Sequence, residues 1–89
     1  MVQLFVHHKV HDFDHWRTVF DSMDSLRQRY GSTGARVFRN ASDPSEVIIL
    51  TEWPSFDHAQ QYAQSDDLRQ GMQQAGVMSP PEVLFLEEV

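Results

Sequence analysis

The sequence has no cysteine among its 89 residues, and it has a single lysine. The absence of cysteine excludes thiol catalysis, disulfide bonds and cysteine-ligated zinc, and it is consistent with a cytoplasmic protein. Thirteen acidic residues against seven basic ones give a net charge of −6. Because the arginines are scattered and form no basic stripe, we expect neither nucleic acid nor an anionic membrane as a partner.

Long apolar runs and phosphate-binding motifs are also missing. No apolar segment approaches the roughly 20 residues of a membrane span, and the N-terminus lacks the features of a signal peptide, so we predict a cytoplasmic location. There is no glycine-rich phosphate loop, no GxGxxG and no nucleophile elbow. These absences leave cofactor-free chemistry or simple binding, and the length predicts a single domain over residues 1–89.

Residues 46–53 are the segment around which the chain is organised. Four consecutive apolar residues, 47–50, lie between a turn cluster at 40–45 and Pro54. Because successive side chains of a strand point to opposite sides, this pattern predicts a central strand that is covered on both faces.

Apolar patterns predict three further strands, over residues 3–10, 34–40 and 83–86. Turn residues at 41–45 join the second and third strands into a hairpin, in which we expect Val37 opposite Ile49. The last strand, like the third, is apolar on both faces.

Two helical stretches separate the strands. The first begins after Asp12, a sound N-cap, and is predicted as one long amphipathic helix that ends at Gly31. The second begins after Ser55, has a fresh N-cap at Ser65 before an acidic pair, and ends at Gly76.

The order strand, helix, strand, strand, helix, strand predicts an α+β fold of the ferredoxin-like βαββαβ type. Right-handed crossovers place both helices on one face of a four-stranded antiparallel sheet whose central strands are the first and third. The helices then leave the other face uncovered, although two strands are apolar on both sides. We therefore expect a homodimer that forms through this open sheet face.

Short motifs along almost the whole chain point to a known family: His8-Lys9-Val10, Asp12-Phe13, Trp16, Phe38-Arg39-Asn40, Glu52-Trp53 and residues 81–88. Together they resemble the dimeric α+β barrel superfamily, and within it the small proteins related to antibiotic biosynthesis monooxygenases. The resemblance implies a dimer whose two sheets form a barrel. It also implies a cavity for a small hydrophobic or aromatic ligand, placed between each sheet and its own helices or inside the barrel.

The predicted hairpin register sorts side chains onto two faces. One face is aliphatic and suits the helices, whereas the other combines apolar and polar groups, namely Arg36, Phe38, Asn40, Ile48, Leu50 and Glu52. Such a mixture is typical of a ligand cavity, and it makes Asn40 and Glu52 candidates for hydrogen bonding or proton transfer. The alternative is that Glu52 pairs with Arg36 or Arg39 across the hairpin.

Four histidines lie near the end of the first strand: His7, His8, His11 and His15. Because His7 and His8 point to opposite faces of a strand, we do not expect three of them to converge on a metal ion. His8 is the first choice for a catalytic imidazole and His7 the second, for substrate contact; the alternative is that all four are structural or exposed. Trp53 either contacts substrate or wedges the corner between strand and helix.

The resemblance favours a cofactor-independent monooxygenase that acts on a small aromatic or polyketide-type substrate. Such a substrate supplies its own electrons, so the protein needs a base, a hydrogen-bond donor for a developing oxyanion and a dry pocket. We assign these roles to His8, Asn40 and Glu52, with His7, Arg36, Phe38 and Trp53 as substrate contacts. Two alternatives stay open: a noncatalytic dimeric module for small-molecule binding or assembly, and a cyclase or isomerase on the same fold.

Overall fold

The structure, a computed structural model, describes residues 1–89 as four strands and four helices. The strands are β1 (Val2–Lys9), β2 (Gly34–Asn40), β3 (Asp43–Trp53) and β4 (Glu82–Glu87). The helices are α1 (Phe13–Ser22), α2 (Asp24–Tyr30), α3 (Phe56–Ala63) and α4 (Asp66–Gln74). This arrangement confirms the predicted ferredoxin-like α+β fold, and none of the helices is long and apolar enough to cross a membrane.

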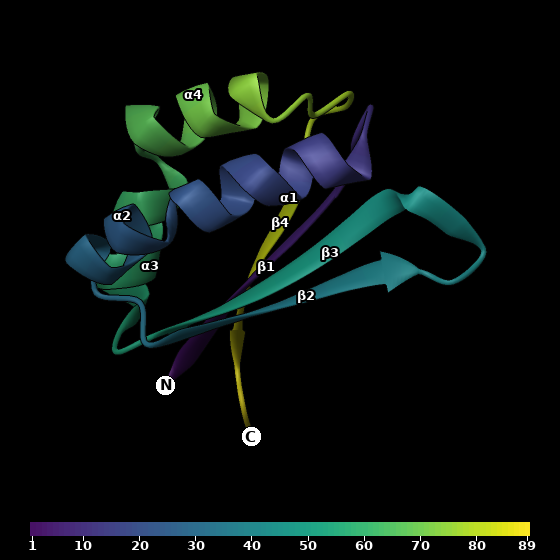
Figure 1. The fold of residues 1–89 in the computed structure, drawn as a ribbon. Coiled ribbons are helices and arrows are strands. Elements are labelled where there is room, and N and C mark those ends of the chain that lie inside the picture. The colour runs from purple at the N-terminus through teal and green to yellow at the C-terminus, as the bar shows by residue number, and fades with distance from the viewer.

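The strands form one antiparallel sheet in the order β2-β3-β1-β4, so the first and third strands are central, as predicted. All four helices lie over the same face of this sheet (Figure 1). Val37 pairs with Ile49 in the hairpin, as expected, and Val6 of β1 pairs with the same Ile49 from the other side. The register therefore puts Val6, and with it His8, on the helix-covered face.

The prediction of one continuous helix from Asp12 to Gly31 is wrong, because the helix is interrupted at Met23. Asp12 caps α1 as predicted, accepting hydrogen bonds from two backbone N–H groups of the first turn. At Met23 the backbone leaves helical geometry (φ −91°, ψ 2°), and its N–H turns back to the carbonyl of Phe20. A new helix, α2, then runs to Gly31, whose φ of 109° suits glycine.

The two helices after β3 begin where the sequence predicts, whereas the hairpin turn differs from its prediction. Ser55 and Ser65 cap α3 and α4 by accepting hydrogen bonds from the backbone N–H groups of residues three positions later, which confirms both caps. The hairpin turn is shorter than the predicted 41–45, because β3 already begins at Asp43. Pro44 is accommodated within β3 beside an irregularity in the ladder at Arg39 and Asn40.

The hydrophobic core lies between the sheet and the helices. Its largest fully buried side chains are Leu4, Val10, Val47 and Trp53. The indole N–H of Trp53 donates to the Thr51 hydroxyl at 2.8 Å, and its ring packs against that of Tyr62, so Trp53 wedges the corner where β3 meets α3.

The opposite side of the sheet, here called the open face, has no helix over it. Its apolar side chains are only partly covered, and Leu84 is 47% exposed. They come from all four strands: Phe5, Phe38, Ile48, Leu50, Leu84 and Leu86. This confirms that β3 and β4 are apolar on both faces and leaves a continuous uncovered surface.

Candidate functional site

An interior cavity of about 50 Å³ lies between the sheet and the helices. Fifteen residues from β1, β3 and all four helices or their ends line it, and eleven of them are hydrophobic. The space has room for a few water molecules but is smaller than the roughly 300 Å³ at which small-molecule sites begin. A ring-sized ligand therefore needs a side chain of the wall to move.

His8 occupies one end of this cavity. It is only 4% exposed, its ring meets Trp16 edge to face with 5.9 Å between centroids, and neither ring nitrogen has a hydrogen-bond partner. Burial, with a smaller contribution from the nearby His7, lowers the pKa of His8 from 6.5 to about 4. The imidazole is therefore neutral at pH 7 and offers a nitrogen lone pair to the cavity.

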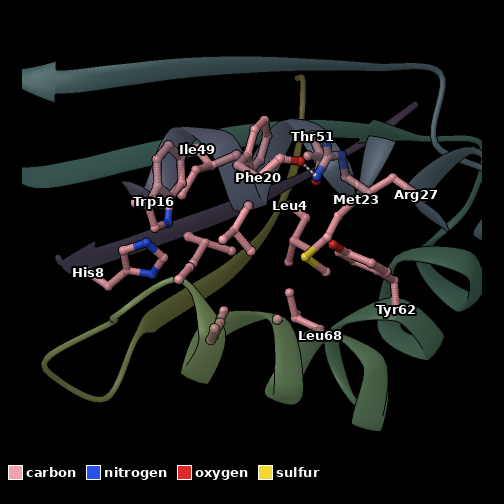
Figure 2. A pocket seen from close by; sticks show the side chains of 15 residues that line it. Leu4, His8, Trp16, Phe20, Met23, Arg27, Ile49, Thr51, Tyr62 and Leu68 are labelled. Atoms are coloured by element: carbon pink, nitrogen blue, oxygen red, sulfur yellow. Dashed lines mark hydrogen bonds between the residues drawn. The ribbon is translucent and has the colours of Figure 1, made fainter. Parts of the chain in front are cut away.

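Arg27, Thr51 and Tyr62 form the other end, here called the basic end (Figure 2). Arg27 is only 3% exposed; one guanidinium nitrogen donates to the Phe20 carbonyl at 3.0 Å, and the group lies 3.8 Å from the centre of the Phe20 ring. Burial raises the pKa of Tyr62, and the charge of Arg27 acts in the opposite direction. The Tyr62 hydroxyl is thus protonated at neutral pH and can donate a hydrogen bond.

Met23 lies beside the basic end and narrows the cavity there (Figure 2). Its thioether passes so close to Gly71 of α4 that a Cβ at Gly71 would lie 2.4 Å from the sulfur. Methionine has three rotatable side-chain bonds and adapts to irregular space, so Met23 can move aside more readily than the branched and aromatic lining residues.

The predicted site residues do not all lie in this cavity. His8 lines it, and Trp53 is buried on the same face behind Thr51. The other five lie on the open face: His7, Arg36, Phe38, Asn40 and Glu52. His8 therefore does not converge with Asn40 and Glu52, and the catalytic roles of those two residues stay a prediction.

On the open face the structure brings His7 and Asn40 together through Glu46, which the sequence did not single out. His7 Nε2 lies 2.5 Å from one carboxylate oxygen of Glu46, and the Asn40 amide donates to the other at 3.1 Å. The hydrogen bond from Asn40, and next that from His7, lower the pKa of Glu46. The three side chains form one hydrogen-bonded cluster on an uncovered surface.

Glu52 lies at the far end of the open face. It accepts hydrogen bonds from Gln3 at 3.1 Å and Thr33 at 2.9 Å. The expected alternative, a pairing with Arg36 or Arg39, is wrong, because these arginines lie over the rings of neighbouring aromatic residues instead.

Sequence reasoning missed several lining residues, above all Arg27, which was not among the candidate site residues. The break at Met23 turns Arg27 inward, and no glycine or proline marks that break. Thr51 could have been found, because it alternates with Ile49 on the helix-facing side of β3. No group of three or more histidine or acidic side chains is arranged to hold a metal ion, and His8 is the one imidazole among the lining residues.

The protein has an antiparallel sheet in the order β2-β3-β1-β4, with helices over one face and a buried imidazole beneath them. These features define a ferredoxin-like α+β protein with a site between sheet and helices. Residues 1–74 match the family model described as antibiotic biosynthesis monooxygenase. The chain therefore belongs to this family, which confirms the resemblance inferred from its motifs.

Solved structures share the fold at low sequence identity. A Bordetella bronchiseptica protein assigned to the antibiotic biosynthesis monooxygenases is 18% identical, with a TM-score of 0.83 over 99% of this chain and 96% of that chain. SnoaB of Streptomyces nogalater, described as a cofactor-independent oxygenase, is 13% identical, with a TM-score of 0.76 over 99% and 94%. A conserved protein of Methanosarcina mazei is also 13% identical, with a TM-score of 0.78 over 99% and 92%. No curated protein matches the chain in sequence.

Proposed function

We propose that this protein is a cofactor-independent monooxygenase that binds a small aromatic or polyketide-type substrate between its sheet and helices. The observation that carries the proposal is His8, a buried neutral imidazole whose two nitrogens have no partner in the protein. An unpartnered buried polar group costs about 1–3 kcal/mol of stability, so its presence is better explained by a ligand than by folding. Membership of the monooxygenase family supports the same conclusion.

In the proposed reaction, neutral His8 takes a proton from an enolisable C–H of the substrate. The resulting carbanion reduces molecular oxygen, a C–O bond forms and a peroxide results. Loss of water from the peroxide breaks the O–O bond and leaves a carbonyl, so one oxygen atom enters the product and the other leaves as water with two hydrogens of the substrate carbon. A substrate that fills the cavity displaces water from its apolar wall, so the imidazolium and the substrate anion attract each other strongly there.

Substrate binding requires the cavity to open, because about 50 Å³ cannot hold an aromatic ring system. We propose that Met23 swings away from Gly71 when the substrate enters. The break between α1 and α2 places this flexible side chain against Gly71 of α4, beside the basic end, where its movement would enlarge the cavity (Figure 2).

The same proposal includes a homodimer formed through the open face. The partly exposed apolar side chains of this face span all four strands, and a second copy packed face to face would cover them. The cluster of His7, Asn40 and Glu46 would then lie inside the resulting barrel, where the predicted role of Asn40 can be tested. Native mass spectrometry at micromolar concentration should show a dimer, and a monomer there would contradict this part of the proposal.

A second candidate function is noncatalytic binding of a small molecule, which is favoured by the separation of His8 from Asn40 and Glu52 on opposite faces of the sheet. A cyclase or isomerase on the same fold would use the same proton transfer to His8 without consuming oxygen. Oxygen uptake separates these functions.

Anthrone, a ring ketone with an enolisable CH₂ group, is a suitable probe because its monooxygenation to a quinone requires no other reactant. The wild-type protein should accelerate oxygen uptake from anthrone solutions containing a metal chelator. His8→Leu should lose this acceleration, while the exposed control His11→Gln should keep it. Equal uptake with wild-type protein and with buffer contradicts the monooxygenase proposal.

A further inference from the structure

The cavity has a second polar feature that the proposed reaction does not use, the basic end formed by Arg27, Thr51 and Tyr62. We infer that the basic end is an anion-binding subsite, and that the substrate is an aromatic or polyketide-type acid whose carboxylate, or comparable oxyanion, binds there. The inference rests on the proposed function, because it assigns a substrate class to the same cavity.

Arg27 is the only charged residue that lines the cavity, because His8 is neutral and no lining residue is acidic. Its one acidic partner is Asp24, which lies 3.6 Å away on the outer side and whose side chain is 62% exposed. Of the five N–H groups of the guanidinium, one donates to the Phe20 carbonyl and another hydrogen-bonds the Tyr62 hydroxyl, which leaves further donors without a close acceptor in the protein. A buried cation with one distant, solvated partner has donors available for an anion.

The neighbours of Arg27 also suit an oxyanion. Burial holds the Tyr62 hydroxyl in its protonated form, and in its hydrogen bond with Arg27 the guanidinium is the donor, so the hydroxyl proton is available for a ligand. The Thr51 oxygen accepts from the Trp53 indole, which leaves its own proton free to donate. In Figure 2 the Arg27 and Tyr62 side chains lie at the same end of the cavity, remote from His8. One charged and two neutral hydrogen-bond donors therefore surround this end. None of the three side chains carries a negative charge that would repel an anion.

The two ends together fix an orientation. An anionic group at the basic end places the opposite end of a flat apolar substrate against His8 and Trp16, with the aliphatic side chains of β1 and β3 along its length. The reacting C–H is thus presented to the imidazole. A substrate of the same shape without the negative charge would lack the interaction that selects this orientation.

The competing explanation is that Arg27 only braces the junction of α1 and α2 through the Phe20 carbonyl. A matched pair of probes separates the two roles: 2-naphthoate carries a carboxylate, and 2-naphthamide is a neutral molecule of nearly the same shape. Binding is measured at pH 7 by isothermal titration calorimetry. We expect wild-type protein to bind naphthoate about tenfold more tightly than naphthamide, the size of one charged hydrogen bond.

Arg27→Met should bind both probes with equal affinity, and Arg27→Lys should retain part of the preference for naphthoate. The control is Arg17→Met, because Arg17 also lies by the Phe20 ring but is exposed and paired with Asp21 at 3.2 Å. This control should bind as the wild type does. If Arg27→Met does not fold, Tyr62→Phe supplies the variant and should reduce the preference by weakening the same subsite.

The outcomes separate the two proposals. Wild-type protein that binds both probes equally overturns the anion subsite and leaves the His8 cavity as a binding site. A preference for naphthoate that survives Arg27→Met also overturns the subsite, because another group then supplies the charge. Binding of neither probe overturns the cavity as a substrate site, and the subsite with it.

Discussion

Replacing His8 with leucine is expected to change how the stability of the protein depends on pH. In the wild type the folded-state pKa of His8 is about 4, below its ordinary value of 6.5. As the pH falls below 6.5, the unfolded chain takes up a proton that the folded chain refuses, so the free energy of unfolding decreases until about pH 4. At about 1.36 kcal/mol for each pKa unit, the full decrease is about 3 kcal/mol.

Two carboxyl groups with shifted pKa values, Asp43 and Glu46, act below this window. Asp43 and Glu46 have lowered pKa values in the folded state, so the stability that they contribute is present above their ordinary values of 3.8 and 4.5 and is lost below them. The contribution of His8 is therefore lost between pH 6.5 and 4.5, before those of Asp43 and Glu46 are lost.

The assay is urea unfolding followed by tryptophan fluorescence at several pH values from 4.5 to 8. His8→Leu should lack the decrease between pH 6.5 and 4.5, whereas the exposed control His11→Gln should retain it. At pH 7 His8→Leu should also be more stable by about 1–3 kcal/mol, because two unpartnered buried nitrogens are removed. A wild-type profile that is flat across this window, or an unchanged profile in His8→Leu, would refute the reasoning.

Three further predictions concern the cavity, the open face and the first helix. Met23→Ala should destabilise the fold by about 2 kcal/mol, which is at the lower end of the range for truncating a buried methionine because Met23 is only half-buried. The same change should enlarge the cavity and tighten the binding of naphthamide in calorimetry. Leu84→Glu on the open face should convert a dimer into a monomer in native mass spectrometry, while the exposed helix variant Gln73→Glu should remain dimeric. Asp12→Ala should lower the free energy of unfolding by about 1 kcal/mol in urea, because two backbone donors of α1 lose their acceptor; an unchanged midpoint would contradict this cap.

Much of the sheet could be predicted from the sequence because the patterns that identify strands and turns are local. The continuous apolar run around Ile49 identified the central strand, and the period of two fixed which residues share a face. Turn chemistry joined the hairpin, and the capping residues Asp12, Ser55 and Ser65 marked three helix starts correctly.

The relation between separate segments could not be predicted in the same way. Whether His8 shares a face with Asn40 depends on the pairing of Val6 with Ile49, a contact between residues far apart in the sequence that no local pattern encodes. As a result the expectation grouped His8 with Asn40 and Glu52, although the sheet separates them.

The break at Met23 was likewise invisible, because neither proline nor glycine produces it. The bonding of the Phe20 carbonyl to both the Met23 N–H and the Arg27 guanidinium is a tertiary arrangement. This arrangement brings Arg27, a charged residue, into the core, whereas amphipathic spacing alone would place it on the surface.

The central claim is that the His8 cavity catalyses insertion of one oxygen atom into an enolisable aromatic substrate. The most direct measurement is mass spectrometry of the anthraquinone formed from anthrone under ¹⁸O₂, with wild-type protein and His8→Leu compared in the presence of a chelator. The account predicts that wild-type protein produces quinone carrying one ¹⁸O atom faster than buffer alone, and that His8→Leu produces it at the rate of buffer. Equal rates for wild-type protein and His8→Leu, or wild-type quinone without ¹⁸O, would contradict it.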